Sequence, residues 1–215
     1  IHASPTCVMI FGDGHSKDVE KGAIGWLVGE ENKGLACMFT MMNNARLAVG
    51  IQGVAVAEAA FQKALTFSHE RRQGRVTGYK GEAMSPIYGH PDVKRMLMSM
   101  KSMTQAARAI CYACAHAIDM SQKGGPDAAF WSDRASLLTP LAKSYSTDIG
   151  MEVTSLGVQV HGGMGFIEET GAARYMRDAR AKCVAEGATE MHYAIIANQL
   201  LHNQPTLVPT NIVKT

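Results

Sequence analysis

The chain has 215 residues, of which 47% are hydrophobic and 19% are charged, so it can form a packed core and is not a disordered, collagen-like or disulfide-scaffold protein. The charges of its 21 basic and 19 acidic residues nearly cancel, leaving a net charge of +2. Binding to nucleic acid requires a concentrated basic face, so this composition does not indicate a nucleic-acid partner. No run of about 18 apolar residues predicts a membrane span. Five cysteines, an odd number in a chain of this size, indicate a reducing compartment. Because the first residue is Ile1, we expect a piece of a longer protein.

Residues 1–34 differ in pattern from the rest of the chain. Two short apolar runs, residues 7–11 and 23–28, are bounded by glycines and predict β-strands. Two strands alone do not form a stable sheet in water. We therefore expect residues 1–34 to be the C-terminal remnant of a β domain.

From about residue 35 the apolar residues recur with helical spacing. Leu47, Ile51 and Val54 predict a first helix that ends near residue 72, before a glycine-rich stretch. A second helix follows Pro91, and its apolar stripe alternates between spacings of three and four. The members of this stripe are Val93, Met96, Met100, Met103, Ala107, Ile110, Cys114 and Ala117.

A third helix follows Asp127, which is a candidate N-cap, and ends at the glycines of residues 162–165. Pro140 should either kink this helix or mark its first turn. Its expected stripe is Leu138, Leu141, Tyr145, Ile149, Leu156 and Val160. A fourth helical stretch covers residues 170–201 with a weak point at Gly187. The predicted fold is thus mainly α: an antiparallel four-helix bundle over residues 35–203, preceded by the β remnant and followed by a tail or linker at 204–215.

Cysteines and histidines are the first candidates for chemistry. Cys111 and Cys114 have the spacing of a redox or metal motif, but Cys114 lies in the apolar stripe and no second ligand pair follows, so we interpret them as buried thiols. The eight histidines lack metal-ligand spacing, and most are interpreted as surface or capping residues. His161 is the exception because of its neighbours.

Residues 159–166, Gln-Val-His-Gly-Gly-Met-Gly-Phe, form the most informative segment. One glycine suffices to cap a helix, so three in four residues indicate that something large approaches the backbone. Glu186 follows an apolar stretch and is either a candidate base or an ordinary surface residue. Arg71 and Arg72 fit a solvated helix end, and Arg46 fits either a solvent-facing turn or a polar site.

Four segments together resemble the C-terminal helical domain of the acyl-CoA dehydrogenases. They are residues 29–35 (GEENKGL), 41–47 (MMNNARL), 159–172 (QVHGGMGFIEETGA) and 177–187, which contains Arg177-Asp178-Ala179-Arg180 and Glu186-Gly187. They occur in the family's order and approximate spacing, and they cover nearly all of residues 7–202. Residues 90–97 (HPDVKRML) most resemble a large bacterial subgroup that includes the 3-methylmercaptopropionyl-CoA dehydrogenases.

The resemblance implies a flavoenzyme with an N-terminal helical domain, a middle β domain and a C-terminal bundle. It implies FAD between the β domain and the bundle, with contacts from a neighbouring subunit. The implied reaction is α,β-dehydrogenation of an acyl-CoA thioester: a carboxylate removes the α proton while the β hydrogen leaves as hydride to flavin N5. The implied partners are an acyl-CoA substrate, an electron-transfer flavoprotein and further copies in a homodimer or homotetramer. The expected location is the cytoplasm of a bacterium, or the mitochondrial matrix of a eukaryote.

Position by position, the resemblance makes Glu186 the base. Asn43, Arg46 and Gly187 match positions that contact the substrate. The positions that match flavin contacts are Arg71, Arg72, Gln73, Gln159, Val160, His161, Gly162, Gly163 and Ala188. The resemblance implies no metal ligand.

Some positions depart from the family pattern. The family usually has an aromatic residue where this chain has Ala185, and a threonine where it has Ala188. It usually has a glutamine at the position of Glu190 and an aromatic residue at the position of Gly74. An alternative therefore stays open, in which the chain is a flavin-free helical bundle used for dimerisation or scaffolding. The intact Glu186, Arg46 and glycine cluster favour the enzyme.

Overall fold

The computed structural model describes residues 5, 7–12, 21–81 and 83–202, which fall into two units that divide after Met41. In the first unit, the described residues before Gly34 contain no strand, so the strands predicted at 7–11 and 23–28 are wrong. A backbone hydrogen bond from Gly22 N–H to the Gly12 carbonyl, at 2.6 Å, joins the glycines that flank these two runs. The two runs do not form strands here because a strand needs neighbouring strands to pair with its backbone groups.

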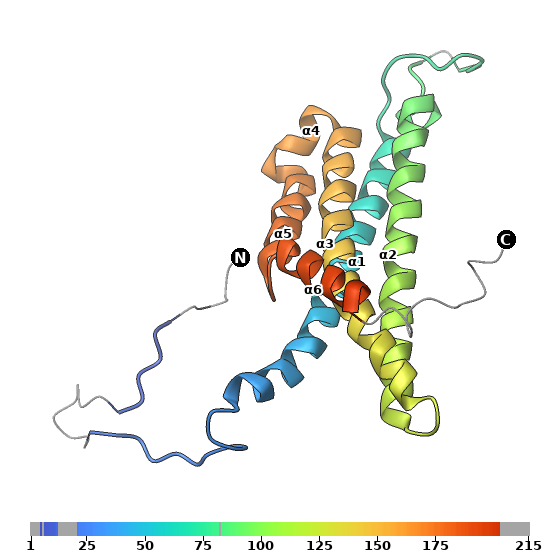
Figure 1. Ribbon diagram of the computed structural model, residues 1–215. Helices are drawn as coiled ribbons and strands as arrows, with labels where there is room; N and C mark the ends of the chain where they lie inside the picture. Colours follow the sequence, from blue (N-terminus) through green and yellow to red (C-terminus); the bar gives the residue numbers. More distant parts are fainter. Residues whose placement is uncertain (1–4, 6, 13–20, 82, 203–215) are drawn as a thin grey trace. The chain divides into compact units, whose positions relative to one another are not determined.

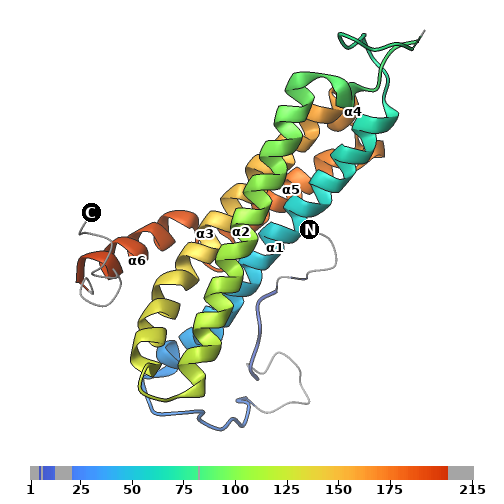
Figure 2. The same cartoon turned by 90° about the vertical axis from the view of Figure 1, so that its right-hand side faces the viewer.

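The second unit is helical, as predicted (Figure 1). Its elements, including a first helix that begins in the first unit, are α1 (Gly34–Glu70), α2 (Pro91–Lys123), α3 (Ala128–His161), α4 (Gly163–Phe166), α5 (Ala172–Val184) and α6 (Thr189–His202). From Met42 onward, α1, α2, α3 and α5 alternate in direction and lie side by side, so the antiparallel four-helix bundle is confirmed (Figures 1 and 2). Instead of one fourth helix there are two, and α6 crosses α3 obliquely.

Helix boundaries follow the expected local signals with one exception. Pro91 occupies the first turn of α2 and Asp127 the N-cap position of α3, although the Asp127 side chain makes no capping hydrogen bond. Gly162 ends α3 with a φ of 61°. Pro140 lies inside α3, so the first-turn alternative is wrong. Residues 204–215, expected to be a tail, lie outside the described residues.

α3 is the central helix of the bundle, packed against α2, α5 and α6 and in close contact with α1. A Cβ placed on Gly53 of α1 would lie 2.6 Å from the Ser146 carbonyl oxygen, and one on Gly50 would lie 2.8 Å from that of Ala142. The two backbones therefore touch. Of the stripe predicted for α3, only Ile149 and Val160 are buried, because small residues rather than leucines face α1.

The core itself follows the α2 stripe closely. Met96, Met100, Ala107 and Cys114 are buried at the predicted spacing, and they pack with apolar residues of α1 and α3. None of the described helices is long and apolar enough to span a bilayer.

Candidate functional site

The turn between α5 and α6 carries the expected base. Glu186 has a φ of 57° and Gly187 a φ of 98°, so both adopt the left-handed conformation. For a residue other than glycine this conformation costs about 1–3 kcal/mol and persists only where surrounding contacts impose it. Glu186 is half-buried. The turn is thus held against its local preference.

Lys143 of α3 supplies one of the contacts that hold this turn. Its side chain is fully buried, and its ammonium donates hydrogen bonds to the carbonyl oxygens of Cys183 at 2.9 Å and Gly187 at 2.5 Å. Burial lowers the pKa of Lys143, while Cys183 and Asp148 act in the opposite direction. The two carbonyls bracket Glu186 on both sides.

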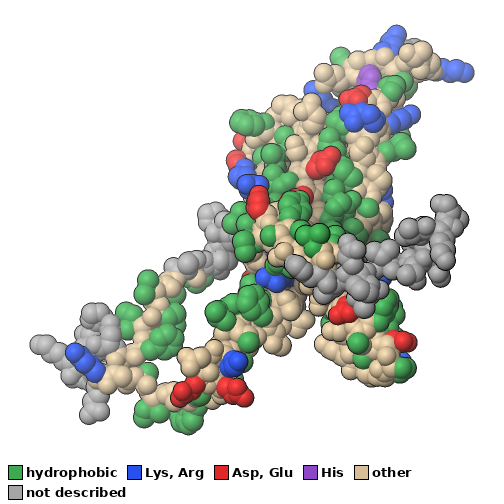
Figure 3. Space-filling model, in the orientation of Figure 1, with side chains coloured by type: hydrophobic (Ala, Val, Ile, Leu, Met, Phe, Trp, Pro, Cys, Tyr) green, Lys and Arg blue, Asp and Glu red, His purple; other side chains and the backbone are tan. Residues whose placement is uncertain are grey.

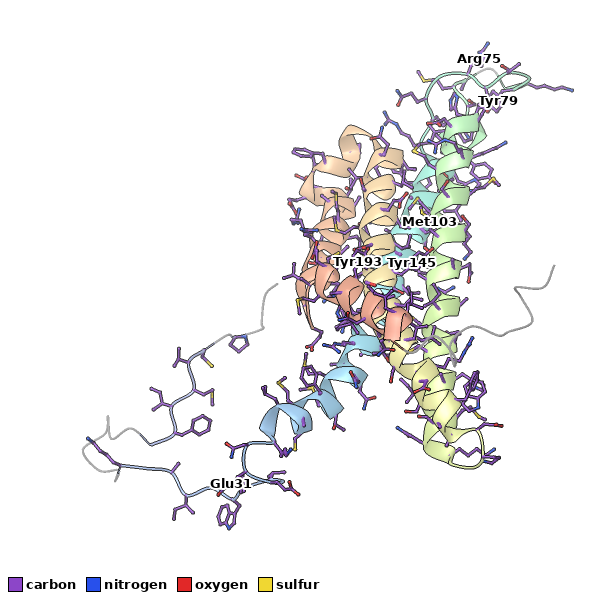
Figure 4. All side chains as sticks on the ribbon, viewed as in Figure 1. Glu31, Arg75, Tyr79, Met103, Tyr145 and Tyr193 are labelled. Atoms are coloured by element: carbon purple, nitrogen blue, oxygen red, sulfur yellow. The ribbon has the colours of Figure 1, made fainter. Side chains whose placement is uncertain are left out.

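Asp148, about one turn further along α3, holds the start of α6. It accepts hydrogen bonds from the hydroxyls of Thr189 at 3.2 Å and Tyr193 at 2.7 Å. The bond to Asp148 raises the pKa of Tyr193, which Figure 4 labels where α6 crosses α3. Consequently α3 anchors the chain both before and after Glu186.

His192 lies beneath the same turn. The ring is fully buried, which corrects its interpretation as a surface or capping residue, and its Nε2 is 3.2 Å from the position of a Cβ on Gly187. Burial, together with the positive charges of Lys143 and Arg46, lowers the pKa of His192. The backbone of Glu186 and Gly187 counters part of this effect, although neither ring nitrogen makes a hydrogen bond of regular geometry. The imidazole is therefore neutral near pH 7.

Arg46 of α1 belongs to this polar region, because its charge lowers the pKa of both Lys143 and His192. The guanidinium is half-buried and donates to Asn43 Oδ1 at 3.3 Å. The structure thus brings together Asn43, Arg46 and the turn containing Glu186, Gly187 and Ala188. Lys143 and His192 were missed from the sequence. No sequence signal marked Lys143, because its position lies outside the apolar stripe predicted for α3.

The other predicted residues gather at the far end of the bundle, where α1 and α3 end. Phe67 of α1 stacks on His161 of α3 with ring centroids 4.3 Å apart, and both line a cavity of about 560 Å³. Arg71, Arg72 and Gln73 follow α1 and are exposed. Arg72 donates to the Tyr79 hydroxyl at 3.2 Å and to the Met84 carbonyl at 3.3 Å.

The glycine segment presents backbone rather than side chains. A Cβ on Gly162 or Gly163 would meet no atom within 4 Å, so the main chain is open to close approach. Gln159 is exposed, whereas Val160 and His161 are buried, with the ring of His161 bordering the cavity beside Phe67. His161 Nδ1 lies 2.7 Å from the Gly157 carbonyl, and burial lowers its pKa.

The two groups of residues are well separated. Lys143 and His161 are 18 positions apart on α3, which corresponds to about 27 Å along the helix. The region around Glu186 and the region around Gly162 therefore cannot touch the same atoms of a ligand.

A third feature is an apolar groove of about 870 Å³ over α3, α4 and α5. Its apolar lining is Met151, Val158, Phe166, Ile167, Ala173 and Met176, with Arg177 and Arg180 beside it. Figure 3 shows hydrophobic side chains among charged ones over this end of the bundle. Phe166 is 82% exposed, so this face leaves a large aromatic ring in contact with water.

The paired cysteines have no such exposure. Cys111 and Cys114 are fully buried, as their interpretation as core thiols predicted, and they contact the hydroxyls of Ser146 and Thr139. Burial raises the pKa of both thiols. Among the described residues, no group of three or more His, Cys, Asp and Glu side chains is placed to hold a metal ion.

Known proteins are similar to this chain in sequence and in fold. The family model described as "Acyl-CoA dehydrogenase, C-terminal domain" matches residues 32–201. The 3-methylmercaptopropionyl-CoA dehydrogenase of Ruegeria pomeroyi is 46% identical over 94% of this chain and 32% of its own length. A butyryl-CoA dehydrogenase of Syntrophomonas wolfei is 34% identical over 87% of this chain and 31% of its own. The solved butyryl-CoA dehydrogenase of Megasphaera elsdenii superimposes with a TM-score of 0.66 and 30% identity, over 81% of this chain and 40% of that one.

Proposed function

The chain belongs to the acyl-CoA dehydrogenase family, and we propose that it is the C-terminal part of an FAD-dependent enzyme that dehydrogenates an acyl-CoA thioester between its α and β carbons. The carrying observation is the turn at Glu186, which is held in a left-handed conformation beside Arg46 and Asn43 within the matched residues. The chain spans about a third of the length of the curated relatives it matches, so the activity is proposed for the longer protein.

The chemistry explains why a fixed carboxylate is needed. The α proton of a thioester is weakly acidic, so a base must be held at a defined position in a region shielded from water. Glu186 accepts this proton in our proposal, and Asn43, Arg46 and Gly187 contact the substrate. Bound FAD would accept the β hydrogen as hydride, while the protein supplies orientation and electrostatics.

The residues at the far end of the bundle fit a flavin nucleotide. The backbone at Gly162 and Gly163 is open to close approach, and Arg71 and Gln73 are exposed N–H donors of the kind that bind phosphate oxygens. In our proposal this end contacts FAD held by a neighbouring subunit, while Glu186 and Ala188 face the chain's own cofactor. The separation of about 27 Å supports this division.

Because the two ends of the bundle contact different FAD molecules in our proposal, the enzyme must be at least a homodimer, and we propose a homodimer or homotetramer. The exposed apolar groove lined by Phe166 and Met176 is a surface suited to such an assembly. An electron-transfer flavoprotein is the proposed electron acceptor. The matched relatives are named for butyryl and 3-methylmercaptopropionyl thioesters, so we propose a short acyl chain as substrate.

Residues 1–34 are assigned to the end of the β domain. Val8, Phe11, Trp26 and Val28 are exposed in the described part of this segment, and further strands would cover them. All five cysteines are free, which supports a reducing compartment such as the bacterial cytoplasm.

The proposal is tested with Glu186→Gln in the complete enzyme, using Glu152→Gln on the exposed face of α3 as the matched control. A flavin absorption spectrum comes first, since a colourless protein would favour the scaffold alternative that Ala188 and Glu190 left open. Anaerobic mixing with butyryl-CoA or 3-methylmercaptopropionyl-CoA should then bleach the flavin in the parent and the control. We expect Glu186→Gln to slow bleaching by roughly 10²–10⁴-fold, the usual effect of losing a general base. Bleaching at the parent rate would refute the assignment of Glu186.

A further inference from the structure

The turn that carries Glu186 has too little local support to explain its conformation. Glu186 takes a left-handed backbone at a non-glycine position, between two helices that end and begin on either side of it. The Ala185 N–H bonds back to Ala181, which closes α5, but the next residues leave the helical path. The restraint must come from another element.

That restraint reaches the turn from α3. The last carbonyls of a helix lack partners within the helix, and Cys183 contributes one of them near the end of α5. The Lys143 ammonium donates to this carbonyl and to that of Gly187, the residue after Glu186. A positive charge at a helix C-terminus is also favoured by the helix dipole. One cation thereby ties together the chain on both sides of Glu186.

Burying a lysine at position 143 costs free energy, because its charge is removed from water. The two hydrogen bonds to the α5–α6 turn must offset this cost. Lys143 is 0% exposed, and a buried charge is unfavourable unless it is paired and hydrogen-bonded. Neighbouring buried positions of α3 hold Ser144 and Thr147, whose hydroxyls bond to carbonyls of α3 itself. Lys143 instead donates its hydrogen bonds to carbonyls of another element, at the end of α5 and in the α5–α6 turn.

Building on the proposed function, we propose that Lys143 is a positioning residue for the base, in that it fixes the left-handed backbone of Glu186 by holding the carbonyls of Cys183 and Gly187. Asp148 completes the arrangement from the same helix by binding Thr189 and Tyr193 at the start of α6. The rigid face of α3 therefore sets where the Glu186 carboxylate meets the α carbon. A displacement of the base by about 1 Å can slow a reaction by roughly 10²-fold without weakening substrate binding.

The test uses Lys143→Met in the complete enzyme, because methionine is similar in length but has no N–H donor. We expect kcat to fall roughly 10²-fold while KM for butyryl-CoA stays within a few-fold. The isotope effect with α-deuterated butyryl-CoA should rise, because removal of the α proton becomes slower. Hydrogen exchange of the amides at 184–188 should accelerate, while exchange at 149–160 should not.

Val153→Ala is the matched control, since Val153 is fully buried on α3 and the variant loses stability without touching the turn. It should leave kcat, the isotope effect and exchange at 184–188 unchanged. The proposal would be overturned if Lys143→Met kept the parent kcat, isotope effect and exchange rate at 184–188. It would also be overturned if Val153→Ala changed these three quantities as Lys143→Met does. If Lys143→Met does not fold, Lys143→Arg is used instead, and a reduced kcat with hydrogen exchange at 184–188 at the parent rate would overturn the proposal, because the turn would then be held while the reaction is slowed. Glu186→Gln with parent activity would instead remove the proposed function on which the inference rests.

Discussion

Replacing Gly53 with alanine tests the closest contact between two helices of the bundle. The added methyl group would lie 2.6 Å from the Ser146 carbonyl oxygen and 2.9 Å from its carbonyl carbon. Ordinary contacts begin near 3.4 Å, so one helix must move away by about 0.8 Å. Because backbone atoms cannot rotate aside as a side chain can, the cost should reach the upper part of the roughly 1–3 kcal/mol range for overpacked cores.

Helix propensity acts in the opposite direction and must be subtracted. Alanine is favoured over glycine by about 1 kcal/mol inside a helix. The expected net loss for Gly53→Ala is therefore about 2 kcal/mol. At roughly 2–4 °C per kcal/mol for a chain of this size, the melting temperature should fall by about 4–8 °C.

Gly157→Ala provides a matched control with the opposite sign. This glycine lies inside α3 and faces α1 and α2, but its added methyl group would meet Met100 at 3.5 Å and Ala60 at 3.6 Å, which are ordinary contacts. The propensity gain should then dominate and raise the melting temperature by about 2–4 °C. Circular dichroism melting of the parent and both variants decides the question. A Gly53→Ala chain as stable as the parent would refute the backbone contact between α1 and α3.

Two further predictions concern titration and thiol chemistry. Burial lowers the pKa of His161 and His192 below the ordinary value of 6.5, so the unfolded chain binds more protons and stability should fall as the pH drops from 7.5 to 5.5. Urea midpoints should show this loss, and His161→Phe should reduce it; an equal loss in that variant would contradict the role of His161. With Ellman's reagent at pH 8, only Cys7 and Cys37 should react in the folded chain, because the other three cysteines are buried. Rapid reaction of a third thiol without denaturant would show that the core opens easily.

The long helices were predictable because local signals and periodicity agree. Pro91 begins α2, and its stripe of Met96, Met100, Ala107 and Cys114 is buried as the spacing predicted. Such a pattern records which side of a helix faces its neighbours. The strands predicted at 7–11 and 23–28 were wrong for the complementary reason that strand pairing depends on parts of a chain distant in sequence.

The break after α5 was only partly predictable. Gly187 marked a weak point, but the left-handed residue before it is Glu186, whose side chain does not favour that conformation. The sequence around Glu186 and Gly187 does not reveal that Lys143, which lies 43 positions before Glu186, donates a hydrogen bond to the Gly187 carbonyl. The structure brings the predicted site residues Arg46 and Gly187 into one region, and their roles stay predictions, whereas the residues that hold this region lie outside every motif.

The central position of α3 explains why those residues were missed. A helix surrounded by other helices is buried on most sides, so an apolar stripe no longer distinguishes inside from outside. Ser144, Thr147 and Thr154 are buried with hydroxyls bonded to their own helix, and they act mainly as small fillers. Lys143 is buried among them but bonds to another element. Burial of a polar side chain is therefore not itself a mark of function in such a helix, and the destination of its hydrogen bonds is what distinguishes a filler from a residue that shapes the site.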